Sequence, residues 1–155
     1  MARREEPVSP AEAATFLLDE CRMVLPGIQA LFGFQLIAVF NARFDEILAP
    51  GEQRLHFAAL TLVAIAIAIL MSTAALHRGM GVKTVSDTFL RIATRLLLAS
   101  MVPLALAIAL DFYLIGRIIL GDSIALPIAA ALVAVFVFLW GVLPRSRRLQ
   151  ALLDR

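Results

Sequence analysis

The sequence predicts an all-α integral membrane protein, a four-helix bundle with a short N-terminal interfacial helix. Apolar residues make up 61% of the 155 residues and charged residues only 17%, which is more apolar surface than a soluble domain of this length can bury. The apolar residues also gather in four stretches, each long enough to cross a bilayer at about 1.5 Å per residue. We therefore expect one transmembrane domain over residues 1–155, with spans at about 23–42, 57–76, 96–116 and 123–144.

The segment before the first span predicts a helix of its own. Ser9 suits an N-cap, Pro10 suits the first helical position, and Glu12 has the spacing of a capping box. Because an apolar stripe with a more polar opposite face follows, we expect an amphipathic helix over about 10–24 at the cytoplasmic interface. Pro26 then predicts a bend where the first span begins.

The connections between the spans differ in the structure that they predict. The first loop has a Pro50-Gly51 turn and three acidic residues, which is typical of a solvated connection. In the second loop, TVSD at residues 84–87 has capping-box spacing, so the third helix should begin near Val85. The third loop is so short that the last two helices should form an antiparallel hairpin. Residues 145–155 predict a basic cytoplasmic tail.

The distribution of the fourteen basic residues predicts the orientation. If both termini are cytoplasmic, eleven of them lie on that side and only Arg43, Arg54 and Arg117 lie outside. This asymmetry follows the positive-inside rule. The cytoplasmic charges are divided among three short segments without interleaved aromatic residues, so we expect lipid headgroups, and no nucleic acid, as their partner.

Residues that carry chemistry are few, and we expect no enzyme, no cofactor and no metal site. His56 and His77 lie at opposite ends of the second span, about 31 Å apart at 1.5 Å per residue, so they cannot ligate one haem. Cys21 is the one cysteine, which excludes a thiol oxidase that needs paired thiols. The sequence shows no glycine-rich phosphate loop, serine elbow or metal-ligand cluster.

Polar residues inside the spans are the candidate site. Gln29 and Gln35 in the first span lie about 120° apart around a helix, so they form no common stripe, and hydrogen bonding between helices is their expected role. In the third span, four residues return to one face at offsets of three, seven and eleven positions. We expect this face to point into the bundle; it consists of Ser100, Pro103, Ala107 and Asp111.

Asp111 is the most informative of these residues, because a carboxylate inside a span is costly unless it faces the bundle interior. Two partners are within plausible reach on the outer side, Arg43 after the first span and His56 before the second. If Arg43 is close, the pair is ionised and structural. If no cation is close, the acid becomes a proton or cation site. We favour the structural pair.

The segment ECRMVLPGIQALFGFQ, residues 20–35, and a second span that ends in ALHR resemble a family of small bacterial four-span membrane proteins known only as a domain of unknown function. The likeness covers most of residues 14–118. The resemblance implies the four-span topology and a place in the bacterial inner membrane, and it implies no established activity. Its most specific positions are Glu20, Arg22, Pro26, Gly27, Gln29, Phe32 and Phe34.

Two functions of different classes remain open. One is a homo-oligomer in which the third helix lines a path for protons, cations or a small solute, supported by the intramembrane acid and by Pro103 and Pro127 within spans. The other is a structural or accessory subunit of a larger membrane complex. The many small residues in the spans favour self-association in either case.

Overall fold

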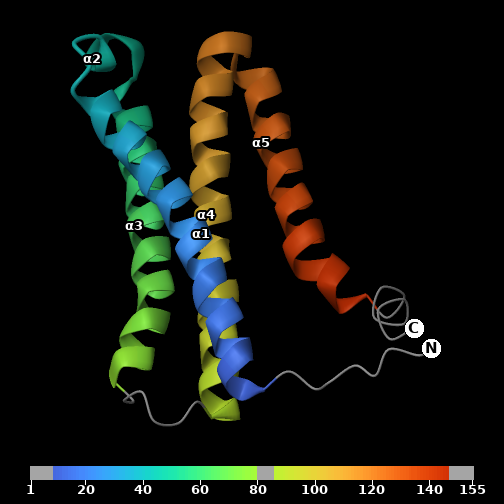
Figure 1. Cartoon of the computed structure of the whole chain (residues 1–155). Coiled ribbons are helices and arrows are strands. Elements are labelled where there is room, and N and C mark those ends of the chain that lie inside the picture. Colours follow the sequence, from blue (N-terminus) through green and yellow to red (C-terminus); the bar gives the residue numbers. More distant parts are fainter. Residues whose placement is uncertain (1–8, 80–85, 147–155) are drawn as a thin grey trace.

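Helices dominate the computed structural model, which describes residues 9–79 and 86–146. Within these ranges no residue forms a strand, so the all-α prediction is confirmed (Figure 1). Four helices are long and apolar enough to cross a membrane, and the chain is a membrane protein with transmembrane helices. These four helices are Pro10–Val39, Pro50–Gly79, Asp87–Leu120 and Asp122–Arg145.

The helices run up and down along one axis (Figure 1). We call the end with α2 and the α4–α5 turn the upper end, and the end with the start of α1 the lower end. The elements are α1 (Pro10–Val39), the short α2 (Phe44–Ile47), α3 (Pro50–Gly79), α4 (Asp87–Leu120), α5 (Asp122–Phe136), a π-helical turn η1 (Val137–Val142) and a 3₁₀ turn η2 (Leu143–Arg145).

The first helix begins as predicted but does not divide. The Ser9 hydroxyl accepts a hydrogen bond from the Glu12 amide at 3.3 Å, and the Glu12 carboxylate accepts one from the Ser9 amide at 2.9 Å. From there α1 continues through Pro26 to Val39 without a break, so no separate interfacial helix is distinguishable. The carbonyl that Pro26 frees belongs to Arg22, a residue in the lower half of α1 whose side chain is exposed.

The connections correct two further expectations. Pro50 begins α3 and the short helix α2 precedes it, so the first loop is more structured than the expected solvated turn. The N-cap of α4 is Ser86, whose hydroxyl accepts from the Phe89 amide at 3.3 Å. Val85, where that helix was expected to begin, lies outside the described residues, as do residues 147–155 of the predicted tail.

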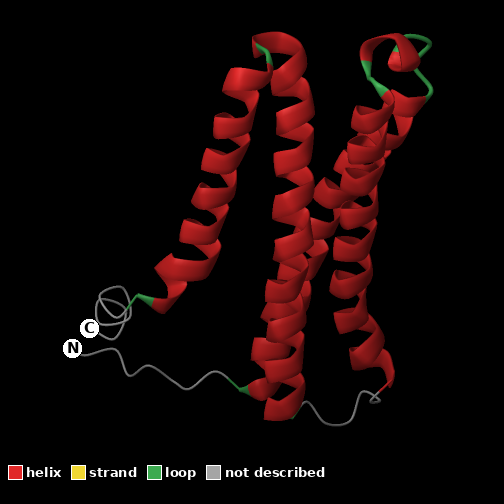
Figure 2. Cartoon of the chain, turned by 180° about the vertical axis from the view of Figure 1, so that it is seen from behind, coloured by secondary structure: helices red, strands yellow, loops and turns green. Residues whose placement is uncertain are grey.

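The α4–α5 turn confirms the predicted antiparallel hairpin. One residue, Gly121, separates the two helices. Its φ of 85° is a backbone conformation that residues with a Cβ rarely adopt. Below this turn α5 diverges from α4, as Figure 2 shows from behind.

Helix α4 is the centre of the bundle, since it packs against α3 on one side and α5 on the other, while α1 crosses both α3 and α4 (Figure 1). The buried apolar side chains form two clusters. The cluster nearer the lower end is Ala14, Leu17, Phe89 and Ala93. The cluster in the middle of the bundle is Ile28, Val63, Leu70 and Ala107.

Candidate functional site

Three polar side chains from three helices meet in the upper half of the bundle. The Gln35 amide nitrogen on α1 donates a hydrogen bond of 2.6 Å to the Asp111 Oδ2 on α4. The His56 Nε2 on α3 lies 2.9 Å from the Gln35 carbonyl oxygen. The His56 Nδ1 faces the Asp111 Oδ1 at 4.0 Å. We call this arrangement the polar triad.

The helices place the triad by register. Gln35 lies one turn before the end of α1, and His56 lies in the second turn of α3. Asp111 shares its face of α4 with Ser100, Pro103 and Ala107, which are buried as the sequence predicted. Because α4 extends to Leu120, Asp111 lies nine residues from the end of its helix, about 14 Å at 1.5 Å per residue. The site therefore lies further from the end of its helix than the predicted span of 96–116 indicated, in which Asp111 was five residues from the end.

The contacts of His56 determine where the protons lie. A carbonyl oxygen only accepts hydrogen bonds, so the Nε2 beside the Gln35 carbonyl carries a hydrogen. In a neutral imidazole the other nitrogen, Nδ1, is then a lone-pair acceptor. That lone pair would face the carboxylate oxygen of Asp111, so that two hydrogen-bond acceptors would face each other without a hydrogen between them. At 4.0 Å the two atoms are beyond hydrogen-bond distance, and one more proton, on either Nδ1 or Oδ1, would make their interaction attractive. The side chains of His56 and Asp111 are only 10% and 16% exposed.

The Gln35 side chain has one polar atom without a partner. Its amide nitrogen is directed at the Asp111 carboxylate, which assigns the other end of the amide to the oxygen. Gln35 is 4% exposed, and its Oε1 has no hydrogen-bond partner among the described residues. A buried acceptor without a donor is costly, so it marks a position where a donor from a ligand or water would be favourable.

A pocket of about 440 Å³ adjoins the triad. It extends from α1 across α2 and α3 to α4, and all three residues of the triad line it. Its remaining lining is almost entirely apolar and contains no lysine or arginine. The full lining is Leu31, Phe34, Gln35, Ala38, Asn41, Phe44, Ile47, Leu48, His56, Ile108, Asp111, Phe112, Leu114, Ile115 and Ile118.

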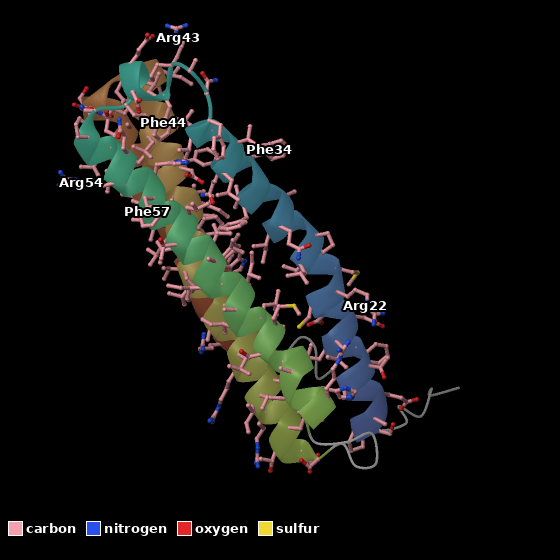
Figure 3. All side chains as sticks on the ribbon, turned by 90° about the vertical axis from the view of Figure 1, so that its left-hand side faces the viewer. Arg22, Phe34, Arg43, Phe44, Arg54 and Phe57 are labelled. Carbon is pink, nitrogen blue, oxygen red and sulfur yellow. The ribbon has the colours of Figure 1, made fainter. Side chains whose placement is uncertain are left out.

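Three other predicted site residues do not join the triad. Arg43 is 74% exposed and pairs with Glu46 at 3.6 Å within the upper loop, and Figure 3 shows it pointing away from the bundle. The favoured Arg43–Asp111 pair is therefore absent from the described structure. Gln29 is exposed on α1. Ser100 is buried, and its hydroxyl donates to the Leu97 carbonyl of its own helix at 2.7 Å.

An ion cluster above the triad was not predicted. Arg117 on α4 lies 2.7 Å from the carboxylate of Glu52 on α3 and also pairs with Asp122 at the start of α5. Glu52 is buried and its second carboxylate oxygen accepts from the Ala49 amide at 2.6 Å. Glu52 follows a Pro-Gly pair that suggested a turn, yet an acid two residues after a proline also fits the first turn of a helix.

Metal-ligating residues do not cluster in the described ranges. No group of three histidine, cysteine, aspartate or glutamate side chains in residues 9–79 and 86–146 is arranged to hold a metal ion. His56 belongs to the triad, whereas His77 lies near the end of α3, against Phe89.

Comparison with known proteins identifies the chain at the level of the family. The sequence model of a family of unknown function, DUF6328, matches residues 13–144. This match spans all four membrane helices except the first few residues of α1 and the last residue of η2. No curated protein matches the chain, and no solved structure matches it.

Proposed function

We propose that this chain, which belongs to the DUF6328 family of unknown function, is a non-enzymatic membrane transport protein that binds a proton at the polar triad. In this proposal the triad takes up or releases its proton as a small solute occupies the adjoining pocket. The observation that carries the proposal is the geometry of His56, whose Nε2 is committed to a carbonyl and whose Nδ1 faces a carboxylate.

The environment of the triad favours a functional role over a purely structural one. Ionisable groups inside a membrane are expensive and are found chiefly where they serve ion or solute pathways. With one added proton, on either His56 or Asp111, the two groups together are neutral, and without it they carry one negative charge. Loss of the proton thus leaves a negative charge in a largely buried site. Binding of a positively charged group in the pocket would compensate this charge.

We extend the proposal to location and orientation. Among the described residues, Arg22, Arg78, Arg91, Arg95 and Arg145 lie towards the lower end, and Arg43, Arg54 and Arg117 lie towards the upper end. The positive-inside rule then favours a cytoplasmic lower end. With the bacterial inner membrane as the location, the triad and its pocket lie in the half of the bundle nearer the outside.

Self-association is also part of the proposal. Helix α5 packs mainly on α4 and leaves most of its surface uncovered, so a second copy has a free helix to contact, most simply in a dimer or a symmetric ring. The mass of the purified protein in nanodiscs and in two mild detergents tests this. A monomeric mass under all of these conditions would contradict it.

The proposed function is tested by proton flux in proteoliposomes with an imposed pH gradient. Asp111→Asn is the informative variant. The oxygen of the asparagine amide still accepts a hydrogen bond from Gln35, while the amide hydrogens of the same side chain face the His56 Nδ1. The variant therefore imitates the protonated acid but cannot release a proton. We expect a folded protein without pH-dependent flux. The matched control is Asp45→Asn, an exposed acid on α2 outside the pocket.

A structural or accessory role is the second candidate, and one contact favours it. The 2.6 Å hydrogen bond between Gln35 and Asp111 joins α1 to α4 within the membrane, as a purely structural contact would. Under this alternative Asp111→Asn, which replaces a hydrogen bond to a charged acceptor with a weaker neutral one, lowers thermal stability or loosens assembly, and any flux falls in proportion to the folded protein. Flux through the folded variant equal to that of the wild type would exclude the proton site.

A further inference from the structure

We propose that the solute of this pocket is an organic ammonium ion, a protonated amine that carries an aromatic or aliphatic group. The inference rests on the proposed function and adds the chemical class of the solute. Three independent features of the pocket support it: its charge, its unpartnered acceptor and its apolar walls.

When the triad releases its proton, the pocket carries one negative charge that a bound cation would neutralise. Asp111 is the one acid in the lining, and the lining holds no lysine or arginine to neutralise it. Towards the upper end Glu52 and Arg117 are engaged with each other, and Arg54, the charged residue next to His56 along α3, is exposed and points away from the bundle (Figure 3). A bound monovalent cation restores neutrality, so proton and cation should compete for the site.

The unpartnered Gln35 oxygen selects a cation that donates hydrogen bonds. Gln35 lines the pocket and its amide nitrogen is held by Asp111, whereas its Oε1 lacks a donor and is buried, so a solute reaches this oxygen once the Gln35 side chain turns towards the pocket. An ammonium group has several N–H donors. It can therefore donate to the Asp111 carboxylate and to the Gln35 amide oxygen at the same time, because these two side chains are in contact. A quaternary or phosphonium ion has the charge without these donors and would leave Oε1 unsatisfied.

The walls of the pocket accommodate an apolar body beside the charge. Phe34, Phe44 and Phe112 line it together with leucine and isoleucine side chains, and aromatic rings also attract cations. Figure 3 shows Phe34 on α1 and Phe44 in the upper loop. A volume of about 440 Å³ lies within the range of small-molecule sites, whereas a bare metal cation would leave most of it empty.

The rim of the pocket favours entry from the hydrocarbon layer. Four large apolar residues of the lining are at least half exposed, namely Phe34, Phe112, Ile115 and Ile118; Asn41 is the exposed polar residue of the lining. An amphiphilic amine concentrates in the bilayer interface, where it can reach such a rim. A lipid acyl chain or a helix of a second copy would satisfy the apolar walls but not the negative charge or Oε1.

The test measures binding to the protein in nanodiscs with three probes of similar apolar character. They are 2-phenylethylammonium, which has charge and donors; trimethyl(2-phenylethyl)ammonium, which has charge without N–H donors; and 2-phenylethanol, which is neutral. We expect the ammonium probe to bind at least about tenfold more tightly than the other two, the ratio typical of one hydrogen bond to a charged group. Empty nanodiscs correct for partition into lipid.

Competition with the proton supplies a second readout. Below the pH at which the triad releases its proton, the affinity for the ammonium probe should fall about tenfold per pH unit, and binding should release one proton to a pH indicator. Asp111→Asn should abolish this binding, and Gln35→Leu should weaken it about tenfold. Asp45→Asn should bind as the wild type does.

The outcomes separate the two proposals. Equal affinity for the three probes, or affinity for the ammonium probe that does not change with pH or in Asp111→Asn, would overturn the ammonium proposal. If Asp111-dependent proton flux persists in that case, the proposed function stands and only the solute class is wrong. Ammonium binding that follows all the expected trends, without any flux in proteoliposomes, would support the solute class and overturn transport.

Discussion

The unit of α1, α3 and α4 and the single helix α5 bury very different side chains. All the polar residues buried within the described ranges lie on α1, α3 and α4, namely Gln35, Glu52, His56, Thr73 and Ser100. Helix α5 buries only Ala125 and Ala129, both against α4. The three-helix unit thus carries the chemistry, while α5 is an apolar helix with free surface for lipid or for another protein.

The largest expected effect comes from a matched pair of phenylalanines, one in each region. Phe89 is 2% exposed in the lower cluster, whereas Phe138 beyond α5 is 54% exposed. Phe89→Ala should lower the free energy of unfolding by about 2–4 kcal/mol through the cavity that it leaves, and Phe138→Ala by about 0.5 kcal/mol or less. Denaturant titration in mixed micelles measures both. Comparable losses would show that α5 is as tightly packed as the rest.

The two acids that share Arg117 sharpen the comparison. Glu52 on α3 is buried, whereas the Asp122 side chain at the start of α5 is 67% exposed. Glu52→Gln should cost about 2 kcal/mol because it removes one partner of a buried pair. Asp122→Asn should cost about 0.5 kcal/mol, as expected for an exposed pair near a helix N-terminus. Melting temperatures rank the two, and the reverse order would show that α5 depends on this contact.

A smaller effect distinguishes the two glutamines of α1. Gln35→Leu removes the hydrogen bond to Asp111 and should cost about 1 kcal/mol, the scale of polar contacts between membrane helices. Gln29→Leu replaces an exposed amide with an apolar side chain and should be neutral or slightly stabilising. Thermal unfolding in nanodiscs measures both variants. A destabilising Gln29→Leu would mean that a partner covers this part of α1.

The smallest expected effect is at Ser100, although this residue is buried. Its hydroxyl bonds to a carbonyl of its own helix and joins no other helix. Ser100→Ala should therefore change the free energy of unfolding by about 0.5 kcal/mol or less, measured by the same titration. Loss of proton flux in this folded variant would place Ser100 in the transport path and extend the site below the triad.

The sequence predicted the helices better than their partners. Span length and composition depend on the bilayer alone, so four helices were predictable. The periodicity of α4 was enough to predict that Ser100 and Asp111 share the inward face, where Ser100 is buried and the Asp111 side chain is 16% exposed. The choice between Arg43 and His56 as the partner of Asp111 depended on the loop fold. The short helix α2 turns Arg43 outwards, while Gln35 and His56 meet through the crossing of α1 over α3, which no periodicity encodes.

The contact between Arg117 and Asp122 bears on how the protein enters its membrane. In the orientation that we propose, with the lower end in the cytoplasm, the α4–α5 turn is a segment that has to be translocated through the hydrocarbon layer during biogenesis. Gly121 brings the two helices into a hairpin with an arginine and an aspartate on either side of it. Because these opposite charges compensate each other, the hairpin is able to insert as one nearly neutral unit, with less cost than two separately charged ends.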